Sequence, residues 1–444
     1  MIFPIIIVGL TCLAMILSVL FKPQVTLKKI TIDTYWVVVL IGALAIIISG
    51  LVDIGFLFDT LTANSSINPL KILVLFISMT VLSIFLDEVG FFRYLSNLTL
   101  KKAKSSQIKL FTTLYIVVSV LTVFTSNDII VLTFTPFICY FAKNAKINPL
   151  PYLIAEFIAA NTMSMTLIIG NPTNIYIATA YGVNFLEYLK IMFLPTLASA
   201  VISYVILYLI FRKTLSVSID ATIDDEGIEN KPYLIIGLIH LSCCTVLLAI
   251  GSYVNLEMWL VSLISAISLF VCIGICKIIQ TARNKAPASA TTNNQSPVIN
   301  CLKRAPWQLI PFVLSMFVMI LALQNAGVTK AINGLLGSDN VIINYGVTSY
   351  LSANLINNIP MSVLFCPIME GLTGTALKGA LYATVVGSNL GALLTPIGAL
   401  AGIMWTSMLK KYDVKLTYLN FVKYGVLISI PSIISSLAVL ALML

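Results

Sequence analysis

Long apolar segments alternate with short polar segments along almost the whole chain. Most of the apolar segments are about 20 residues long, which is the length of a helix that crosses a membrane. They occupy about 2–21, 34–52, 70–86, 186–211, 232–250, 256–279, 306–323 and 418–442. This pattern predicts an all-α polytopic membrane protein.

Two further apolar segments are interrupted by residues that break helices. One begins near Pro151, contains Gly170-Asn171-Pro172-Thr173-Asn174 and continues to about residue 182. The other covers about 376–410 and contains Thr395-Pro396-Ile397-Gly398. Proline removes a backbone donor and clashes with the preceding turn, so we expect each segment to be a membrane helix that is broken near its middle, at 170–174 and at 395–399.

Two pairs of shorter apolar arms flank polar tips. Arms 107–124 and 129–143 flank Ser126-Asn127-Asp128, and arms 340–356 and 359–370 flank Asn357-Asn358. An unwound turn at membrane depth is tolerated only where it is buried in protein or lines a water-filled cavity. We therefore predict two re-entrant hairpins whose tips lie inside the protein.

The hairpins and the breaks recur at nearly the same spacing in the two halves of the chain. Asn127 and Asn357 are 230 positions apart, and the pairs Asn161–Asn389 and Gly170–Gly398 are each 228 positions apart. Matching interruptions of this kind are typical of transporters built from inverted repeats, in which the binding site lies near the middle of the membrane.

The predicted architecture is therefore two inverted repeats of five transmembrane helices, each with a re-entrant hairpin and a broken helix. Residues 1–212 form the first repeat, 213–231 an acidic cytoplasmic loop and 232–444 the second repeat. Outside the spans, we expect a loop rich in turn formers at 53–69, an interfacial amphipathic stretch after residue 86, and a low-complexity linker at 286–296.

The composition supports a membrane protein. Hydrophobic residues make up 59% of the chain and charged residues 10%, whereas soluble domains have about 45–50% apolar and about 25% charged residues. The net charge of +9 is therefore no sign of nucleic-acid binding. The first apolar segment is followed, not preceded, by the basic residue Lys22, which favours a membrane span over a removed signal peptide.

The basic residues are divided unequally between the two sides of this topology. All 26 lysines and arginines fall on one side except Lys71, Lys190, Lys330, Lys378 and Lys423. Basic loops are enriched on the cytoplasmic side of membranes. We therefore expect a plasma-membrane protein with both termini outside the cytoplasm.

The tips and breaks carry the candidate binding residues. Helix starts present free N–H groups and partial positive charge, and unwound carbonyls present the opposite, so a tip can bind an anion, a neutral polyhydroxyl solute or a cation. Ser126 or Asn127 is expected to cap the second arm, and Pro360 suits the first turn of its counterpart. A sodium ion bound by Ser126, Asn127 and Asn357 is one option, and no other metal is expected.

The breaks are expected to line the same site. Asn171 resembles a helix cap with Pro172 at the first helical position, and Thr173 and Asn174 should then face the cavity. Asn161 and Asn389 precede the breaks and can reach the tips. The other candidate lining residues are Thr162, Gly170, Asn354, Asn358, Ser388, Thr395, Pro396 and Gly398.

Two acidic residues lie within apolar segments. A carboxylate inside a membrane is costly and usually functional. Asp128 can hold a sodium ion or carry a proton, and Glu156, near the start of the first broken helix, is a second candidate for proton coupling.

Several motifs resemble those of the arsenite efflux permeases, within the ion transporter superfamily that also includes divalent-anion/sodium symporters and sodium/proton antiporters. They are Leu86-Asp87-Glu88-Val89-Gly90-Phe91-Phe92, Ala305-Pro306-Trp307, Asn357-Asn358-Ile359-Pro360, Gly387-Ser388-Asn389-Leu390-Gly391 and Thr395-Pro396-Ile397-Gly398-Ala399-Leu400. The resemblance implies a homodimer whose transport domains move in an elevator fashion.

The chain also departs from the arsenite permeases. Asn161 and Asn389 stand where those proteins tend to have aspartate, and Gly170-Asn171-Pro172-Thr173-Asn174 is more like the carboxylate transporters. The leading prediction is arsenite or anion efflux coupled to a proton or sodium gradient. Coupled transport of di- or tricarboxylates and sodium/proton antiport stay open as alternatives.

Other functional classes fit the sequence less well. With one histidine, an intramembrane enzyme has few residues for a catalytic set. A channel should show a continuous polar face, whereas here polarity is concentrated at the interruptions. We expect no cofactor, and an ATPase would have to be a separate subunit.

Overall fold

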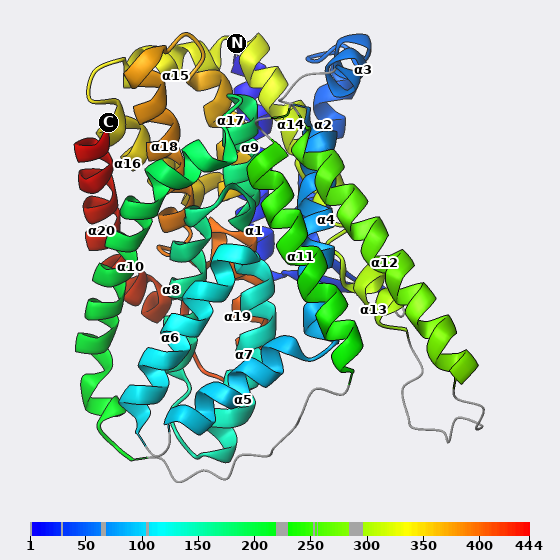
Figure 1. Cartoon of the computed structure of the whole chain (residues 1–444). Coiled ribbons are helices and arrows are strands. Elements are labelled where there is room, and N and C mark those ends of the chain that lie inside the picture. The colour runs from blue at the N-terminus through cyan, green and yellow to red at the C-terminus, as the bar shows by residue number, and fades with distance from the viewer. Residues whose placement is uncertain are drawn as a thin grey trace.

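The chain folds into a bundle of helices that lie roughly along one direction (Figure 1). The computed structural model describes residues 2–27, 30–63, 68–103, 106–218, 230–251, 254, 256–283 and 296–444. Within these residues, eight helices are long and apolar enough to cross a membrane. The chain is thus the multi-pass helical protein that its hydropathy predicts.

The first half contains one small sheet and ten α-helices among its described residues. They are α1 (Ile2–Phe21), β1 (Gln24–Leu27), β2 (Ile30–Asp33), α2 (Thr34–Ile48), α3 (Ile54–Thr62), α4 (Pro69–Glu88), α5 (Phe91–Ala103), α6 (Gln107–Phe124), α7 (Asn127–Asn144), α8 (Leu150–Met163), the 3₁₀ turns η1 (Ser164–Thr166) and η2 (Ile168–Gly170), α9 (Pro172–Ala180) and α10 (Phe185–Leu215). β1 and β2 pair antiparallel.

The described part of the second half is helical. It contains α11 (Lys231–Gly251), α12 (Met258–Arg283), α13 (Pro297–Arg304), α14 (Leu309–Asn325), α15 (Val328–Leu336), α16 (Val341–Ile356), α17 (Asn358–Ile368), α18 (Gly374–Gly391), the 3₁₀ turn η3 (Pro396–Gly398), α19 (Leu400–Lys411) and α20 (Tyr418–Met443). Most of the acidic loop predicted at 213–231 and most of the linker predicted at 286–296 lie outside the described residues.

Several short elements differ from the sequence prediction. The predicted loop at 53–69 contains α3, whose start is capped by the Asp53 carboxylate accepting from the Phe56 N–H at 2.8 Å. The hairpin β1–β2 and the helices α13 and α15 were not predicted. Each is too short for hydrophobic periodicity to distinguish from a loop.

The broken helices form the centre of the molecule. Every residue of α8 from Pro151 to Thr162 is buried, and so is every residue of α18 from Gly379 to Gly391. By contrast, only a minority of the residues of α1, α11 and α12 are buried, and these helices are largely apolar. In Figure 1, α10 and α20 flank the centre on the left, and α11 and α12 on the right. The polar residues of the breaks are therefore shielded by protein on both sides.

Close helix contacts hold the centre together. A Cβ atom added to Gly387 of α18 would lie 1.9 Å from Ser349 Oγ and 2.4 Å from the Gly346 carbonyl oxygen of α16. Small residues allow such close approach between membrane helices. Ser203 of α10 and Ser432 of α20 share a buried hydrogen bond of 2.8 Å, so the last helices of the two halves are joined directly.

Both chain termini lie toward the upper end of the bundle in Figure 1. This placement agrees with the expectation that they share one side of the membrane. The compartment that they face, the inverted repeat and the re-entrance of the hairpins remain predictions.

Candidate functional site

The first tip, defined here as Thr125 to Asp128, joins α6 to α7. α7 begins at Asn127, two residues earlier than the sequence suggested, so only Thr125 and Ser126 are outside the helices. Ser126 occupies the capping position, but its side chain makes no capping hydrogen bond, and the predicted cap at this residue is wrong. The Asn127 amide instead donates to Asn161 Oδ1 of α8 at 3.0 Å.

Three buried side-chain oxygen atoms, two in the first tip and one in the residue that follows Asn161 in α8, have no hydrogen-bond partner among the residues that the structure describes. They are Ser126 Oγ, Asn127 Oδ1 and Thr162 Oγ1. Leaving a buried polar atom unpaired costs about 1–3 kcal/mol. The first tip is therefore a place where added hydrogen-bond donors or a cation would be stabilised.

The second tip, defined here as Asn357 and Asn358, joins α16 to α17. Asn357 has φ 72° and ψ 151°, a region that residues other than glycine rarely occupy. Its Nδ2 donates to the Ile397 carbonyl at 3.0 Å, and its Oδ1 accepts from the Ile359 N–H at 3.3 Å. The side chain thus caps α17, with Pro360 in the first turn as predicted, and ties the tip to the second break.

The first break comes earlier than the sequence predicted. α8 ends at Met163, and residues 164–170 form the two 3₁₀ turns before α9 begins at Pro172. A Cβ atom at Gly170 would lie 2.1 Å from the Ser164 carbonyl oxygen, so only glycine allows the chain to fold back here. Asn171 caps α9 as expected, with its Oδ1 accepting from the Thr173 N–H at 3.2 Å.

Residues from both halves form one hydrogen-bonded group, which we call the amide cluster. It consists of Ser164, Asn171, Thr173, Asn174, Ser388 and Asn389, all at most 1% exposed.

Asn389 lies at the centre of the amide cluster. Its Oδ1 accepts from Ser164 Oγ and Asn171 Nδ2, both at 2.9 Å, and its Nδ2 donates to Asn174 Oδ1 at 2.7 Å. Ser388 donates to Thr173 Oγ1 at 3.1 Å.

The amide cluster corrects two expectations. Thr173 and Asn174 were predicted to face a cavity, but their side chains bond to each other and to α18. Asn389 was predicted to reach a tip, but its side chain bonds to the first break and to its own helix. Asn161 does reach the first tip. A side chain packed between two broken helices pairs with the nearest backbone interruption, and for Asn389 that is the first break.

The second break is also held by side chains. Thr395 Oγ1 donates to Asn354 Oδ1 at 2.7 Å, and Asn354 Nδ2 donates to the Gly391 carbonyl at 3.0 Å. Pro396 and Gly398 lie in η3, as the sequence predicts for a break. Asn354 and Thr395 are therefore brought together, and their bonds shape the segment that Asn357 contacts.

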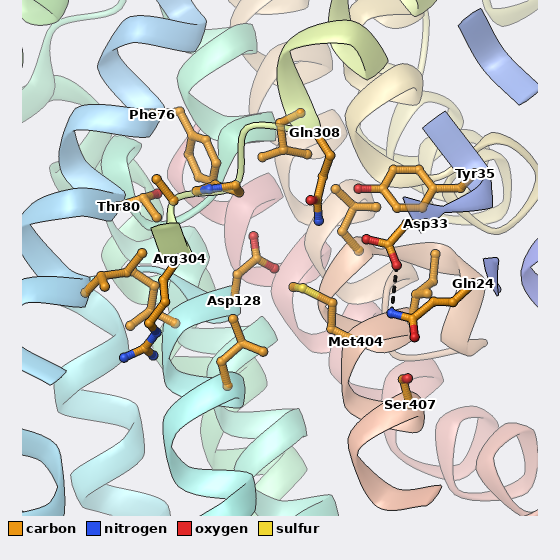
Figure 2. Close-up of a pocket in the computed structure, with 18 of the residues that line it drawn as sticks. Gln24, Asp33, Tyr35, Phe76, Thr80, Asp128, Arg304, Gln308, Met404 and Ser407 are labelled. Carbon is orange, nitrogen blue, oxygen red and sulfur yellow. Dashed lines mark hydrogen bonds between the residues drawn. The ribbon is translucent and has the colours of Figure 1, made fainter. Parts of the chain in front are cut away.

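Asp128 lines a cavity of about 250 Å³ (Figure 2). The cavity lies between the start of α7, α4, the hairpin β1–β2, the start of α2, the segment from α13 to α14, and α19. Asn127, the neighbour of Asp128 in sequence, is not among the lining residues and bonds to Asn161 instead.

Glu156 is fully buried in α8 and accepts from Thr135 Oγ1 of α7 at 3.0 and 3.1 Å. It is neither in the cavity lining nor bonded to either tip. The two candidate carboxyl groups are therefore held in different surroundings, and of the two only Asp128 lines this cavity.

Some residues of the site gave no signal in the sequence. Ser164, Thr135, Gln308 and Tyr35 lie outside the predicted tips and breaks, and no spacing between the two halves of the chain marks them. Ser164 follows Asn161 by one helical turn, which is the one pattern that could have pointed to it.

Comparison with known proteins gives consistent results. A family model described as citrate transporter matches residues 3–380. An arsenical pump membrane protein from Escherichia coli is 27% identical over 425 residues, covering 91% of this chain and 92% of that protein. A 46 kDa membrane protein from Mycobacterium leprae is 23% identical, covering 82% and 84%.

The fold also has a solved counterpart. The crystal structure of the YdaH transporter from Alcanivorax borkumensis matches with a TM-score of 0.54 at 13% sequence identity, covering 99% of this chain and 97% of that one. The resemblance to arsenite permeases that the motifs indicated is confirmed by the relatives named arsenical pump membrane protein.

Proposed function

The chain belongs to the citrate transporter family and is a membrane transporter, and we propose that it is a secondary transporter that exports arsenite. The proposed cargo is arsenous acid, the uncharged form of arsenite that carries three hydroxyl groups. The relatives named arsenical pump membrane protein support this choice, and so does the chemistry of the first tip.

The observation that carries the proposal is the set of three buried oxygens, Ser126 Oγ, Asn127 Oδ1 and Thr162 Oγ1, without described partners. Hydroxyl groups of arsenous acid can donate to such oxygens. A citrate ion would bring three full negative charges to a tip that contributes no basic side chain, where the start of α7 offers only a partial positive charge, and burying such uncompensated charge is costly. The first tip therefore favours a neutral hydroxyl-bearing solute over a polycarboxylate.

Coupling is assigned to Asp128, which can carry a proton or help to hold a sodium ion. The motion is proposed to be of the elevator type, in a homodimer, with the tips and breaks moving as one unit. The bonds that join the first break to the second broken helix through Asn389 support such a unit. Driving by a separate ATPase subunit is compatible with the same site.

Carboxylate transport is the second candidate, because the matching family is described as citrate transporter. Sodium/proton antiport is the third. Uptake of citrate or succinate, and sodium-driven proton movement, can be measured with the purified protein in proteoliposomes. Either activity without arsenite transport would replace the present proposal.

The decisive experiment measures arsenite accumulation in cells that lack their own efflux pump. Cells expressing the wild-type protein should accumulate severalfold less arsenite than cells with an empty vector, and Asp128→Asn should lose this effect at equal membrane expression. Equal accumulation in all three would contradict arsenite export. Full export by Asp128→Asn, with an unchanged dependence on pH and sodium, would remove Asp128 from coupling.

A further inference from the structure

The cavity beside the first tip is large enough to hold a solute. Its volume is about 250 Å³, and a water molecule occupies about 30 Å³ in the liquid, so the space corresponds to about eight waters. Arsenous acid has four heavy atoms. The cavity can therefore hold this cargo together with some of its hydration water.

Three polar side chains from different elements point into this space. Figure 2 shows the carboxylate of Asp128 from α7, the amide of Gln308 just before α14, and the hydroxyl of Tyr35 from α2 directed toward one another. A carboxylate accepts hydrogen bonds, an amide both donates and accepts, and a phenol does both. Together they match a solute whose hydroxyl groups also donate and accept.

The charges around the cavity do not favour an anion. Two aspartates, Asp33 and Asp128, and two basic residues, Lys303 and Arg304, are among its lining residues. Arg304 is engaged by carboxylates at the end of α4: it pairs with Asp87 at 2.6 Å and with Glu88. Its positive charge is therefore compensated by the protein, and a polycarboxylate entering the cavity would meet the two aspartates.

The cavity is adjacent to the buried tip along the chain. Asp128 lines it, whereas Asn127, one residue earlier, is 2% exposed and bonds to Asn161. The first turn of α7 thus has the cavity on one face and the unpaired oxygens near the other. A solute in the cavity needs only a local rearrangement of this turn to reach the tip.

We propose that the cavity lined by Asp128, Gln308 and Tyr35 is a reception site for the uncharged hydroxyl-bearing cargo, and that Gln308 is a specificity-determining residue. This inference rests on the proposed arsenite export, and it adds a second site that is separate from the buried tip. Lys303 and Arg304 place the cavity toward the basic end of the molecule, which the charge pattern predicts to be cytoplasmic.

The test is the initial rate of arsenite uptake into everted membrane vesicles, measured over a range of arsenite concentrations and divided by the amount of folded transporter. Gln308→Leu should raise KM about fivefold, as expected for the loss of one hydrogen bond, and leave kcat unchanged, because binding before the transport step is weakened. Gln324→Leu, at the far end of α14 and outside the cavity, is the matched control and should keep the wild-type KM.

A second pair of variants covers the case in which Gln308→Leu does not fold. Ser407→Leu on α19 narrows the cavity and should also raise KM severalfold, whereas the neighbouring Thr406→Leu should not. Wild-type KM in every folded cavity variant would overturn the reception site and leave arsenite export standing. Absence of saturable arsenite uptake by the wild-type protein would overturn the proposed function and this site with it.

Discussion

The two tips occupy matching places in the sequence but differ in whether the polar groups of their side chains are hydrogen-bonded. At the second tip, both ends of the Asn357 amide are hydrogen-bonded, although its backbone lies in a region that favours glycine. At the first tip, Ser126 has an extended backbone that any residue adopts, and buried oxygens are left without described partners.

The two tips carry different free-energy costs: backbone strain at the second tip and unpaired buried oxygens at the first. A strained backbone persists only where surrounding bonds fix it, and Asn357 is fixed by α17 and by the second break. Unpaired buried oxygens lower stability unless a ligand completes them. The second tip is therefore suited to holding the break in position, and the first tip is suited to binding.

The largest expected effect is on transport through the first tip. Asn127→Ala removes an unpaired oxygen and the bond to Asn161. We expect arsenite flux to fall about 10- to 100-fold, equivalent to the loss of about 1.5–3 kcal/mol of binding, while the free energy of unfolding falls by only about 1 kcal/mol. Flux and thermal unfolding of the purified protein measure the two quantities.

The exposed Asn420 of α20 provides the control for this variant, because Asn420→Ala should keep wild-type flux. Undiminished flux in Asn127→Ala would mean that the first tip does not bind the cargo.

Substitutions of Asn357 in the second tip should lower the free energy of unfolding. Asn357→Ala loses the cap on α17 and the bond to the Ile397 carbonyl while keeping a Cβ at φ 72°, so the free energy of unfolding should fall by about 2–4 kcal/mol. Asn357→Gly keeps the backbone and should lose only about 1 kcal/mol. Thermal unfolding in detergent compares the two.

Flux per folded protein should stay near the wild-type value in Asn357→Gly. If this variant folded normally but lost transport, Asn357 would be a binding residue and the contrast between the tips would disappear.

The smallest effect is expected at Ser126. Its hydroxyl has no described partner, so Ser126→Ala should leave the free energy of unfolding unchanged or raise it by up to about 1 kcal/mol. Arsenite flux should nevertheless fall about two- to tenfold, because one acceptor for the cargo is lost. A variant that is less stable and transports normally would show that the hydroxyl has a structural partner instead.

The sequence predicted the features that depend on local chemistry. The helix cap at Asn171, the place of Pro360 in the first turn of α17, the turn at Pro396–Gly398 and the long apolar helices all follow from residues within one or two turns of each other. The position of the first break was missed because it depends on the packing of Gly170 against Ser164, a contact that no propensity encodes.

By itself, the sequence determined the class of protein and which helices are interrupted, because hydropathy and helix-breaking residues act locally. Only the tertiary structure decided which polar atoms are satisfied. Asn161 and Asn389 have matching positions in the sequence, yet Asn161 bonds to the first tip and Asn389 joins the first break to α18. Hydrogen bonds between distant segments depend on how whole helices pack. This packing gave the second tip partners for its amide and left the first tip with unpaired oxygens.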